Sequence, residues 1–301
     1  MSGQKRVLIT GISGFTGRYL EDLLLSQGHQ VWGTTSVAES SKPQHVTLDL
    51  ADQAGLSHLV QQIQPEWVVH LAAIAHVAHS NADAFYQVNT LGTRHLLEAL
   101  ASLKQAPEAV VLASSANIYG NASVEQLDEL QAAMPANDYA VSKFAMELMA
   151  GLWHKRLPLI VVRPFNYTGR GQSTQFLIPK IVCHFSQRAS VLELGNLNVA
   201  RDFSDVREVV QVYAELLKRG QAGQTYNVCS GNATSLQEIL DICAELSGHR
   251  PEIRVNPAFV RENEVYKLAG VKQKLLDHIG LAPSLPLRDT LAWMLSEQVA
   301  A

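Results

Sequence analysis

Arg6-Val-Leu-Ile-Thr-Gly-Ile-Ser-Gly-Phe-Thr-Gly17 passes from an apolar run straight into three glycines, and an amphipathic stretch of helical length follows. Glycines at this spacing allow a tight turn, let the backbone approach a pyrophosphate, and bring a helix against a strand. The N-terminus of that helix supplies N–H groups and the positive end of its dipole. Three glycines alone are often only a turn, but their place between a strand and a helix favours a dinucleotide site. The residues predicted to line it are Gly11, Ser13, Gly14, Phe15, Thr16 and Gly17.

The alternation of short apolar runs and helical stretches continues through the first half of the chain. Strands are predicted at Arg6–Thr10, Gln30–Thr34, His45–Leu48, Trp67–Leu71, Ala109–Ser114 and Leu159–Arg163. Helices are predicted at Gly17–Gln27, Gln53–Gln64, Ala82–Leu103 and Asp138–His154. Strands separated by helices are typical of a parallel sheet, so we expect an α/β fold with a Rossmann-type doubly wound sheet. Its ligand should lie over the carboxyl ends of the strands.

The composition of the sequence changes after Pro164, where Gly, Asn, Thr and Gln become frequent. Residues 1–165 are therefore predicted to form the dinucleotide-binding Rossmann domain, and residues 166–301 a smaller α/β lobe that binds the substrate. Residues 202–230 read as a helix followed by a strand and are expected to return to the large sheet. A capping box, Ser235-Leu-Gln-Glu238, predicts the start of another helix, which Gly248 should end.

The composition excludes several classes of partner. The 301 residues are 47% hydrophobic and 17% charged, and 24 Lys and Arg face 28 Asp and Glu, for a net charge of −4. A protein that holds nucleic acid normally has an excess of basic residues, so no nucleic-acid partner is expected. Three widely spaced cysteines argue against disulfides or a zinc site and indicate reduced thiols in a cytoplasmic protein. The N-terminal apolar run is too short for a signal peptide, and no stretch is long enough to span a membrane.

The end of the second predicted strand bears on the choice of cofactor. Dinucleotide sites usually carry an acidic residue there, which binds the adenosine ribose hydroxyls and would repel a 2′-phosphate. Here the strand ends in Gly33-Thr-Thr-Ser36, whose hydroxyls tolerate that phosphate. Thr35 and Ser36 therefore favour NADP(H), with NAD(H) as the alternative because no arginine stands there and Lys42 is distant. Asp49, after the third strand, is predicted to accept from the adenine amino group or to cap a helix.

Tyr139-Ala-Val-Ser-Lys143 stands at the start of a predicted helix, which places its Tyr and Lys one turn apart on one face. A tyrosine that exchanges protons near pH 7 needs its pKa lowered from about 10 by roughly 3 units, or about 4 kcal/mol. One ammonium at about 4 Å in an effective dielectric near 20 supplies about that much. Ser115 follows a predicted strand, where its hydroxyl can hold a substrate oxygen near Tyr139. An exposed Tyr–Lys pair and a turn-capping serine are the alternatives, but the glycine turn in the same chain favours catalysis.

Taken in this order, the motifs resemble those of the extended short-chain dehydrogenase/reductases, a family of nucleotide-sugar epimerases, 4,6-dehydratases and 4-keto reductases. The resemblance covers nearly the whole chain. It rests on the glycine turn and on His70-Leu-Ala-Ala73, Val88-Asn-Thr-Leu-Gly-Thr93, Ser114-Ser-Ala-Asn-Ile-Tyr-Gly120, Tyr139 with Lys143, Arg163-Pro-Phe-Asn166, Arg201-Asp-Phe203 and Tyr226-Asn-Val-Cys-Ser-Gly231.

The resemblance implies roles for individual residues. Ser115 would orient the substrate, Tyr139 would transfer the proton, and Lys143 would lower the pKa of Tyr139 and hold the nicotinamide ribose. Asn89 would support the geometry of the site. The cofactor-binding residues implied in this way are Leu50, Leu71, Ala72, Ala73, Asn89, Tyr139, Lys143 and Pro164.

One position separates the chemistries of the family. Its dehydratases carry an acidic pair directly after the catalytic Ser or Thr, because loss of the C6 hydroxyl needs an acid and a base. This chain has Ala116-Asn117, which transfers no proton, so dehydration is disfavoured. Leu194-Gly-Asn-Leu-Asn198 and the stretch from Ala72 to Val77 resemble the branch that handles GDP-mannose derivatives. The resemblance therefore implies a reductase that converts GDP-4-keto-6-deoxymannose to GDP-rhamnose, with a 4-epimerase that retains bound NAD as the alternative.

The resemblance also implies how the nucleotide sugar, with a GDP-sugar favoured, is held. Lys180, Arg201 and Arg261 match the anchors of its diphosphate, with a solvated surface charge as the alternative for Lys180. His76 and His79 have a spacing that metal ligands can have, but they lack a third and a fourth ligand, so no metal is expected. The other predicted substrate contacts are His76, Ser115, Asn117, Tyr139 and Asn166.

The predicted helices Ala82–Leu103 and Asp138–His154 carry stripes of Leu and Ala. These stripes belong to the core, and the resemblance implies that the two helices also form half of a four-helix bundle in a homodimer. A non-catalytic dinucleotide sensor built on the same fold remains as an alternative. The intact Ser115, Tyr139 and Lys143 count against it.

Overall fold

The computed structural model describes residues 3–36, 42–75, 81–122, 124–260 and 266–298. Its largest sheet has seven strands in the order β10-β6-β5-β4-β1-β2-β3, and every neighbouring pair is parallel. The strand order reverses between β1 and β4, so a ligand crevice is expected at the carboxyl ends of these two strands. The strands are β1 (Arg6–Thr10), β2 (Gln30–Thr35), β3 (His45–Thr47), β4 (Trp67–His70), β5 (Ala109–Ala113), β6 (Leu159–Pro164) and β10 (Thr225–Val228).

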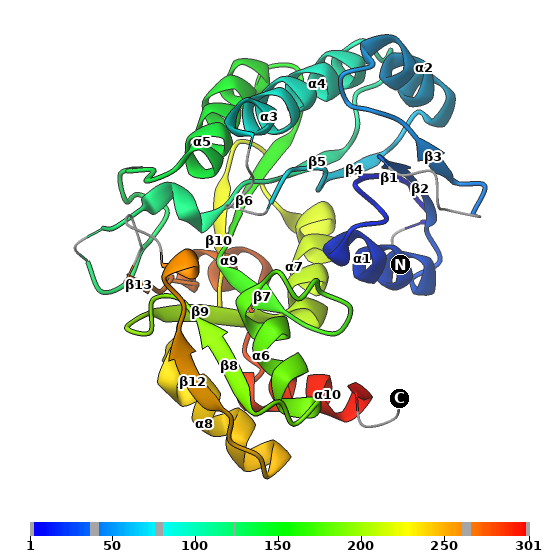
Figure 1. Ribbon diagram of the computed structural model, residues 1–301. Helices are drawn as coiled ribbons and strands as arrows, with labels where there is room; N and C mark the ends of the chain where they lie inside the picture. The colour runs from blue at the N-terminus through cyan, green and yellow to red at the C-terminus, as the bar shows by residue number, and fades with distance from the viewer. Residues whose placement is uncertain (1–2, 37–41, 76–80, 123, 261–265, 299–301) are drawn as a thin grey trace.

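Helices cover both faces of this sheet (Figure 1). Along β1, Val7 and Ile9 belong to the core beneath one helical layer, whereas Leu8 belongs to the core beneath the other. Because both faces are buried, the central strands β1, β4, β5 and β6 are apolar at most positions, and this is why the sequence predicted them. One layer holds α1 (Phe15–Ser26), α7 (Val206–Arg219) and α9 (Gln273–Ile279), and the other holds α2 (Gln53–Ile63), α4 (Thr93–Ala101) and α5 (Asp138–Ala150). The predicted fold class is confirmed.

Two of the predicted helices differ from the structure. The segment Ala82–Leu103 is three consecutive elements, α3 (Ala82–Phe85), the π-helix η1 (Tyr86–Gly92) and α4. Wider π turns often lie at functional sites, and this one carries Asn89. The helix predicted at Asp138–His154 ends as an α-helix at Ala150. It continues only as the 3₁₀ turn η3 (Gly151–Trp153), because the glycine lowers the helix propensity.

The remaining elements form a smaller lobe around a separate apolar core (Figure 1). Ser235 and Glu238 form the predicted capping box at the start of α8, and Gly248 ends that helix in the left-handed conformation. The helices of this lobe are α6 (Leu177–Ser186), α8 (Leu236–Ser247) and α10 (Leu287–Gln298), with the short turn η4 (Pro257–Phe259). Its strands are β7 (Asn166–Thr168), β8 (Val191–Leu194), β9 (Ala200–Asp205), β11 (Ala233–Ser235), β12 (Glu252–Val255) and β13 (Lys267–Leu268).

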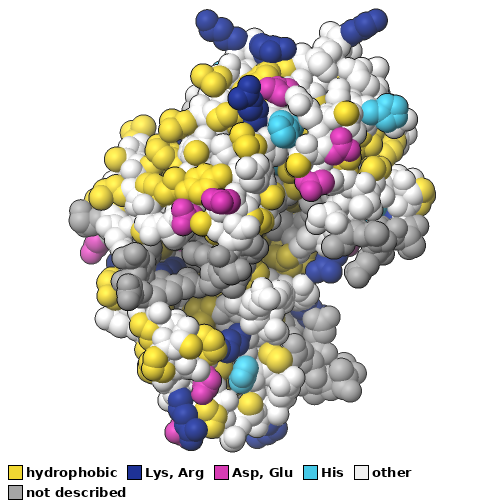
Figure 2. Space-filling model, turned by 45° about the horizontal axis from the view of Figure 1, so that its top comes forward, with side chains coloured by type: hydrophobic (Ala, Val, Ile, Leu, Met, Phe, Trp, Pro, Cys, Tyr) yellow, Lys and Arg dark blue, Asp and Glu magenta, His cyan; other side chains and the backbone are white. Residues whose placement is uncertain are grey.

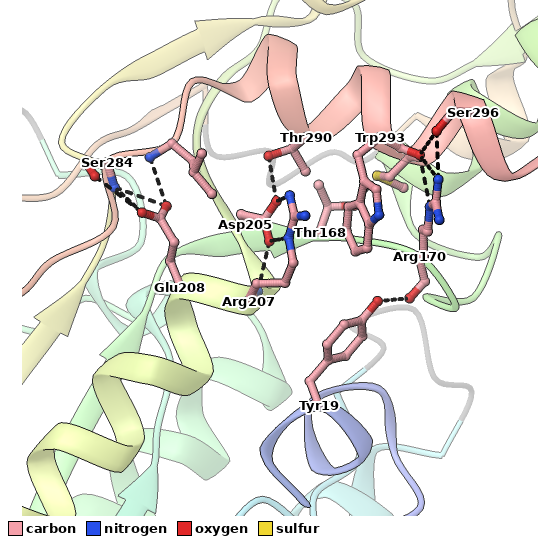
Figure 3. A network of polar contacts seen from close by, with 12 residues as sticks. Tyr19, Thr168, Arg170, Asp205, Arg207, Glu208, Ser284, Thr290, Trp293 and Ser296 are labelled. Atoms are coloured by element: carbon pink, nitrogen blue, oxygen red, sulfur yellow. Dashed lines mark hydrogen bonds and ion pairs between the residues drawn. The ribbon is translucent and has the colours of Figure 1, made fainter. Parts of the chain in front are cut away.

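The last helix, α10, is fastened to the region around α1 and α7 (Figure 3). The Trp293 ring lies between two guanidinium groups, with that of Arg207 at 3.8 Å and that of Arg170 at 4.9 Å from the ring centroid. Asp205 accepts from the Arg207 side chain, which fixes its plane. The Tyr19 hydroxyl of α1 donates to the Arg170 carbonyl at 2.8 Å. This cluster therefore ties the end of the chain to the helix that follows the glycine turn.

The described part of the chain contains neither a membrane-spanning helix nor a cluster of metal-ligating side chains. Within the described residues, no helix combines the length and the apolar character that a membrane span requires. The same ranges contain no group of three or more His, Cys, Asp or Glu side chains that could hold a metal ion. Cys183, Cys229 and Cys243 are free thiols.

Candidate functional site

The glycine turn has the geometry that a dinucleotide site requires. Gly11 has φ +73°, and a Cβ there would lie 2.9 Å from the Ala72 backbone. A Cβ on Gly17 would lie 2.4 Å from the Gly11 carbonyl oxygen, so only glycine lets α1 approach the turn this closely. Gly14 is the N-cap of α1, which has neither a side-chain cap nor an acidic residue in its first turn. The first N–H groups of α1 therefore have no side-chain acceptor among the described residues and fit a bound diphosphate.

Other helices of the fold are capped in a different way. Asp52 caps α2, Asn137 caps α5, Asp205 caps α7 and Ser235 caps α8, each through a side-chain oxygen. Asp52 rather than Asp49 is the cap of α2, and the exposed Asp49 accepts from the backbone N–H of Ala51 at 2.9 Å. Asp49 therefore closes the turn before α2, and its contact with adenine stays a prediction.

The end of β2 lies against the glycine turn. The Thr34 carbonyl accepts from the Gly11 and Ile12 N–H groups at 2.9 and 3.0 Å. The Thr35 hydroxyl lies 2.7 Å from the Ser13 hydroxyl, and Thr35 is buried whereas Ser36 is exposed. The end of β2 therefore presents hydroxyl groups beside the turn.

Lys42, the distant candidate for a phosphate contact, forms an ion pair with Glu21 of α1 at 2.9 Å, and half of its side chain is exposed. His45 also contacts the Glu21 carboxylate, at 2.8 Å. Glu21, which the sequence did not single out, thus holds Lys42 next to α1.

The loop after β4 is fixed by Asn89. Its amide oxygen accepts from the Ile74 N–H at 2.9 Å, and its amide nitrogen donates to the Ser142 hydroxyl of α5 at 3.0 Å. This buried side chain therefore connects the loop that follows β4 to the helix that carries Tyr139. The predicted cofactor residues Leu71, Ala72 and Ala73 lie in that loop, and Leu50 lies buried beneath Gly92.

A chain of hydrogen bonds runs behind this loop through His70. The Ala72 N–H donates to the Thr10 hydroxyl at 3.2 Å, which lies 2.7 Å from His70 Nδ1. His70 Nε2 lies 2.8 Å from the Thr93 hydroxyl, which donates to the Asn89 carbonyl at 2.7 Å. Only one neutral tautomer satisfies both ends, with Nδ1 accepting and Nε2 donating. Burial, helped by the charge of Lys143, lowers the pKa of His70 to about 3, so the ring is neutral.

The three predicted catalytic residues lie at the carboxyl end of β5. Ser115 is the N-cap of the 3₁₀ turn η2 (Ala116–Tyr119), and its hydroxyl accepts from the Asn117 backbone and side chain, both at 3.1 Å. Tyr139 lies in the first turn of α5, and its hydroxyl interacts with Ser115. Lys143 donates from Nζ to the Ala113 carbonyl at 2.7 Å. Both Tyr139 and Lys143 are buried.

The charge states differ from the prediction that Lys143 lowers the pKa of Tyr139. Burial raises the pKa of Tyr139 to about 12, Ser115 opposes this and Tyr167 adds to it. The Lys143 ammonium instead binds the Ala113 carbonyl, and burial lowers its own pKa to about 8, opposed by Glu147. Burial dominates because each charged form loses its hydration. Tyr139 is therefore a protonated phenol at neutral pH, a state that can donate a proton.

Tyr167 is a site residue that sequence reasoning missed. Its ring stacks on that of Phe15 with centroids 6.0 Å apart, and its hydroxyl lies 2.7 Å from that of Thr16. Tyr167 thus joins β7 to the first turn of α1, and it also raises the pKa of Tyr139. Its position directly after the quoted Arg163–Asn166 motif was the only available signal. Pro164, predicted to contact the cofactor, is the last residue of β6 and so lies at the carboxyl end of that strand.

The predicted substrate anchors lie on the smaller lobe. The Lys180 ammonium of α6 lies 4.0 Å from the centre of the Phe259 ring. Arg201 of β9 donates to the carbonyls of Ala200 and Tyr266 at 3.0 and 3.2 Å. Asn166 of β7 reaches the Asp202 carbonyl at 3.5 Å. His76, His79 and Arg261 lie outside the described residues.

Comparison with known proteins identifies relatives over most of the chain. The profile of the family described as GDP-mannose 4,6 dehydratase matches residues 8–294. The chain is 35% identical to GDP-6-deoxy-D-talose 4-dehydrogenase of Aggregatibacter actinomycetemcomitans, and the match covers 91% of each protein. It is 32% identical to GDP-6-deoxy-D-mannose reductase of Pseudomonas aeruginosa, with 97% of each protein covered.

Solved structures share the fold along the whole chain. A protein of Burkholderia cenocepacia J2315, described only provisionally as an epimerase, has a TM-score of 0.92 at 45% identity, with 99% of each chain covered. The structure of RMD from Pseudomonas aeruginosa complexed with NADPH has a TM-score of 0.86 at 30% identity, with 99% and 98% covered. The chain therefore belongs to the GDP-mannose 4,6-dehydratase family of the extended short-chain dehydrogenase/reductases, which are nicotinamide-dependent enzymes.

Proposed function

We propose that this protein reduces the C4 ketone of GDP-4-keto-6-deoxy-D-mannose to the C4 alcohol of GDP-D-rhamnose. A bound nicotinamide cofactor would supply the hydride that reaches C4, and the ketone oxygen would take a proton from Tyr139. The observation that most directly supports this proposal is the buried, protonated Tyr139 beside Ser115 at the carboxyl end of β5. The relatives named for GDP-6-deoxy sugars support the substrate class.

Each catalytic side chain has a separate task in this reaction. The Ser115 hydroxyl holds the ketone oxygen, and Tyr139 donates its proton to that oxygen as negative charge develops there. The Lys143 ammonium lies on the same face of α5 as Tyr139, where it would hold the nicotinamide ribose. Asn89 holds the loop after β4 against α5 through its hydrogen bonds to Ile74 and Ser142.

The residues after Ser115 argue against dehydration, although the matching family profile is described by that reaction. Ala116 is 1% exposed and has no ionisable group, and the Asn117 amide donates to the Ser115 hydroxyl. Neither side chain can remove a proton from C5 or give one to a leaving C6 hydroxyl. The described site therefore supports reduction without elimination.

We propose NADP(H) as the preferred cofactor. The N-terminus of α1 would hold the diphosphate, and the hydroxyls of Ser13, Thr35 and Ser36 would lie near the adenosine ribose. The Pseudomonas aeruginosa structure complexed with NADPH supports this preference. Lys42 forms an ion pair with Glu21, so the carboxylate balances its charge and Lys42 stays a distant candidate for a 2′-phosphate contact. Titration with NADPH and NADH under the same conditions measures the preference, and tighter binding of NADH would contradict it.

We propose further that Lys180, Arg201 and Arg261 bind the diphosphate of the GDP-sugar, and that Asn166, Asn117 and His76 contact the sugar. The ammonium of Lys180 and the guanidinium of Arg201 stand on α6 and β9 of the smaller lobe. Substitution of either cation should raise the KM for the GDP-sugar and leave the affinity for NADPH unchanged. An unchanged KM would remove that residue from the substrate site.

We propose that the protein is a cytoplasmic homodimer that pairs through α5 and the preceding helices. Val141, Leu148 and Leu152 are 37%, 63% and 83% exposed, and their spacing places them on one side of α5 and η3. Figure 2 shows hydrophobic side chains gathered on the face that α5 helps to form. Leu148→Glu should convert the dimer to a monomer, as measured by light scattering. A monomeric wild-type protein would contradict the proposal.

The decisive experiment is incubation of the purified protein with GDP-4-keto-6-deoxymannose and NADPH. We expect loss of nicotinamide absorbance and one equivalent of a GDP-6-deoxyhexose, whose C4 configuration is read by NMR. A tightly bound NAD⁺ with no net consumption of NADPH would instead indicate the 4-epimerase. Conversion of GDP-mannose to the keto sugar would indicate a dehydratase and overturn the role assigned to Ala116-Asn117.

A further inference from the structure

A buried ion pair lies one helical turn beyond the catalytic lysine. Glu147 of α5 and Arg163 of β6 have side chains that are 9% and 11% exposed. The Arg163 guanidinium binds the carboxylate with both Nε, at 3.0 Å, and Nη2, at 2.7 Å. This two-point geometry fixes the carboxylate in both position and plane. The pair lies outside the set of residues that the proposed reaction uses.

Glu147 occupies the same face of α5 as Lys143 and Tyr139. Residues four positions apart on a helix are neighbours, so Tyr139, Lys143 and Glu147 form one row along α5. Lys143 is 4% exposed, and the neutral Ala113 carbonyl accepts from its ammonium. A buried ammonium loses hydration and needs a nearby anion to stay charged. Glu147 supplies that anion from the next turn of the same helix.

Arg163 is itself held from two sides. Its Nη1 donates to the Tyr119 hydroxyl at 3.0 Å and to the Glu129 carbonyl at 3.1 Å. The Tyr119 hydroxyl donates in turn to the Asn227 side chain at 2.7 Å. The guanidinium therefore cannot move without breaking its contacts to Tyr119 of η2 and to the Glu129 backbone, and the Glu147 carboxylate is fixed with it.

We propose that Glu147 is a positioning residue that keeps the Lys143 ammonium charged at working pH, and that Arg163 holds the Glu147 carboxylate in place. The proposal rests on the proposed function only in giving Lys143 a task during turnover. The electrostatic relation between Glu147 and Lys143 is a property of the folded chain and can be measured without substrate or cofactor.

The other titratable groups that face Lys143 cannot replace this carboxylate. His70 of β4 is neutral, because burial lowers its pKa to about 3. Tyr139 on α5 and Tyr119 on η2 are protonated phenols, because burial raises the pKa of each to about 12. Arg163 is a cation and opposes the charge on Lys143. Glu147 is the described carboxylate that raises the pKa of Lys143, against the burial that lowers it.

The charge on Glu147 should move the Lys143 titration by a measurable amount. Neighbours on a helix face have Cβ atoms about 6 Å apart, and two unit charges about 6 to 10 Å apart interact by about one to two pKa units in an effective dielectric near 20. Removing the charge by Glu147→Gln should therefore lower the Lys143 midpoint from about 8 by roughly one to two pH units. The lysine would then be mostly neutral at pH 7.5.

The test is a ¹³C NMR titration of the lysine ε-carbons in the protein without cofactor. Lys143→Arg identifies the Lys143 signal by its disappearance. Wild type, Glu147→Gln and Glu147→Asp are compared, with Glu98→Gln as the matched control, because Glu98 forms an exposed i,i+4 pair with Arg94. We expect the Lys143 midpoint to fall in Glu147→Gln, to fall by less in Glu147→Asp, and to stay unchanged in Glu98→Gln.

The pH profile of kcat/KM gives a second readout. Its alkaline limb should move down by the same number of pH units as the NMR midpoint in Glu147→Gln. An unchanged Lys143 midpoint would overturn the proposal, whatever the activity. If Glu147→Gln does not fold, Glu147→Asp carries the test, since a longer separation should still lower the midpoint. Absence of turnover with every keto sugar would contradict the proposed function alone, because the NMR titration does not need turnover.

Discussion

Acid should destabilise this protein through His70, and the size of the effect can be worked from the structure. The ring is 2% exposed and joins the Thr10 hydroxyl to the Thr93 hydroxyl through its two nitrogens. One of these nitrogens must accept, so a protonated ring breaks the chain of hydrogen bonds and buries a charge. His70→Gln removes the titrating group and leaves a side chain that can still donate and accept.

The folded pKa of His70, about 3, lies below the value near 6.5 of a histidine in the unfolded chain. Between these values the unfolded state binds more protons, so stability is full above about pH 6.5 and is lost progressively as the pH falls toward 3. A change from pH 7 to pH 5 should cost about 2 kcal/mol of unfolding free energy through this residue. At pH 7 the variant itself should be less stable by about 1–3 kcal/mol, because buried hydrogen-bond partners lose the ring.

Urea denaturation followed by circular dichroism, at pH 7 and pH 5, measures both effects. Wild type should lose about 2 kcal/mol more than His70→Gln over this interval, so that the two proteins converge in acid. Glu66 and Glu215, whose pKa values are lowered by hydrogen bonds in the folded chain, contribute equally in both and cancel. The exposed His58→Gln serves as the control for loss of an imidazole. Equal losses in wild type and His70→Gln would refute a neutral, buried His70.

Substitutions at three other residues test the site and the fold. Tyr139→Phe should lower turnover by roughly 100-fold or more while the affinity for NADPH, measured by fluorescence, stays nearly intact, since only the proton donor is lost. Thr35→Asp should shift the ratio of NADPH to NADH affinity toward NADH by at least roughly tenfold, or about 1.4 kcal/mol, because a carboxylate repels a 2′-phosphate and accepts from ribose hydroxyls. Trp293→Ala should lower the free energy of unfolding by about 3–5 kcal/mol, because it removes the ring between Arg207 and Arg170. Trp293→Phe should lower it by less, because a smaller aromatic ring remains there.

The features that the sequence predicted well are set by neighbours along the chain. The central strands, buried on both faces, are apolar at most positions, and the glycine turn, the Tyr139–Lys143 spacing and the Ser235 capping box each occupy a few consecutive residues. The capping box formed as predicted because both of its hydrogen bonds lie within one turn. Patterns of this length are complete before any tertiary contact forms.

The features that the sequence did not predict depend on residues far apart in the chain. His70 forms hydrogen bonds to Thr10, 60 positions earlier, and to Thr93, 23 positions later. Arg170 donates to the backbone carbonyl of Trp293, 123 positions later. The π-helix η1 is equally hidden, because the widened turn leaves the apolar spacing of a helix almost unchanged. Such contacts appear only when the sheet order and the helix packing are known.

The charge states of the site show most clearly what sequence spacing leaves out. Spacing places Lys143 beside Tyr139 and predicts an easily ionised phenol, but burial raises the pKa of Tyr139 and lowers that of Lys143. A ketone reductase begins its proton transfer with the phenol protonated, which is the state that burial favours. A 4-epimerase must first oxidise the sugar alcohol and so must begin by removing a proton, which requires the phenolate that burial disfavours. In the chain without cofactor, burial therefore keeps the phenol in the state from which reduction starts, and the spacing alone did not predict this.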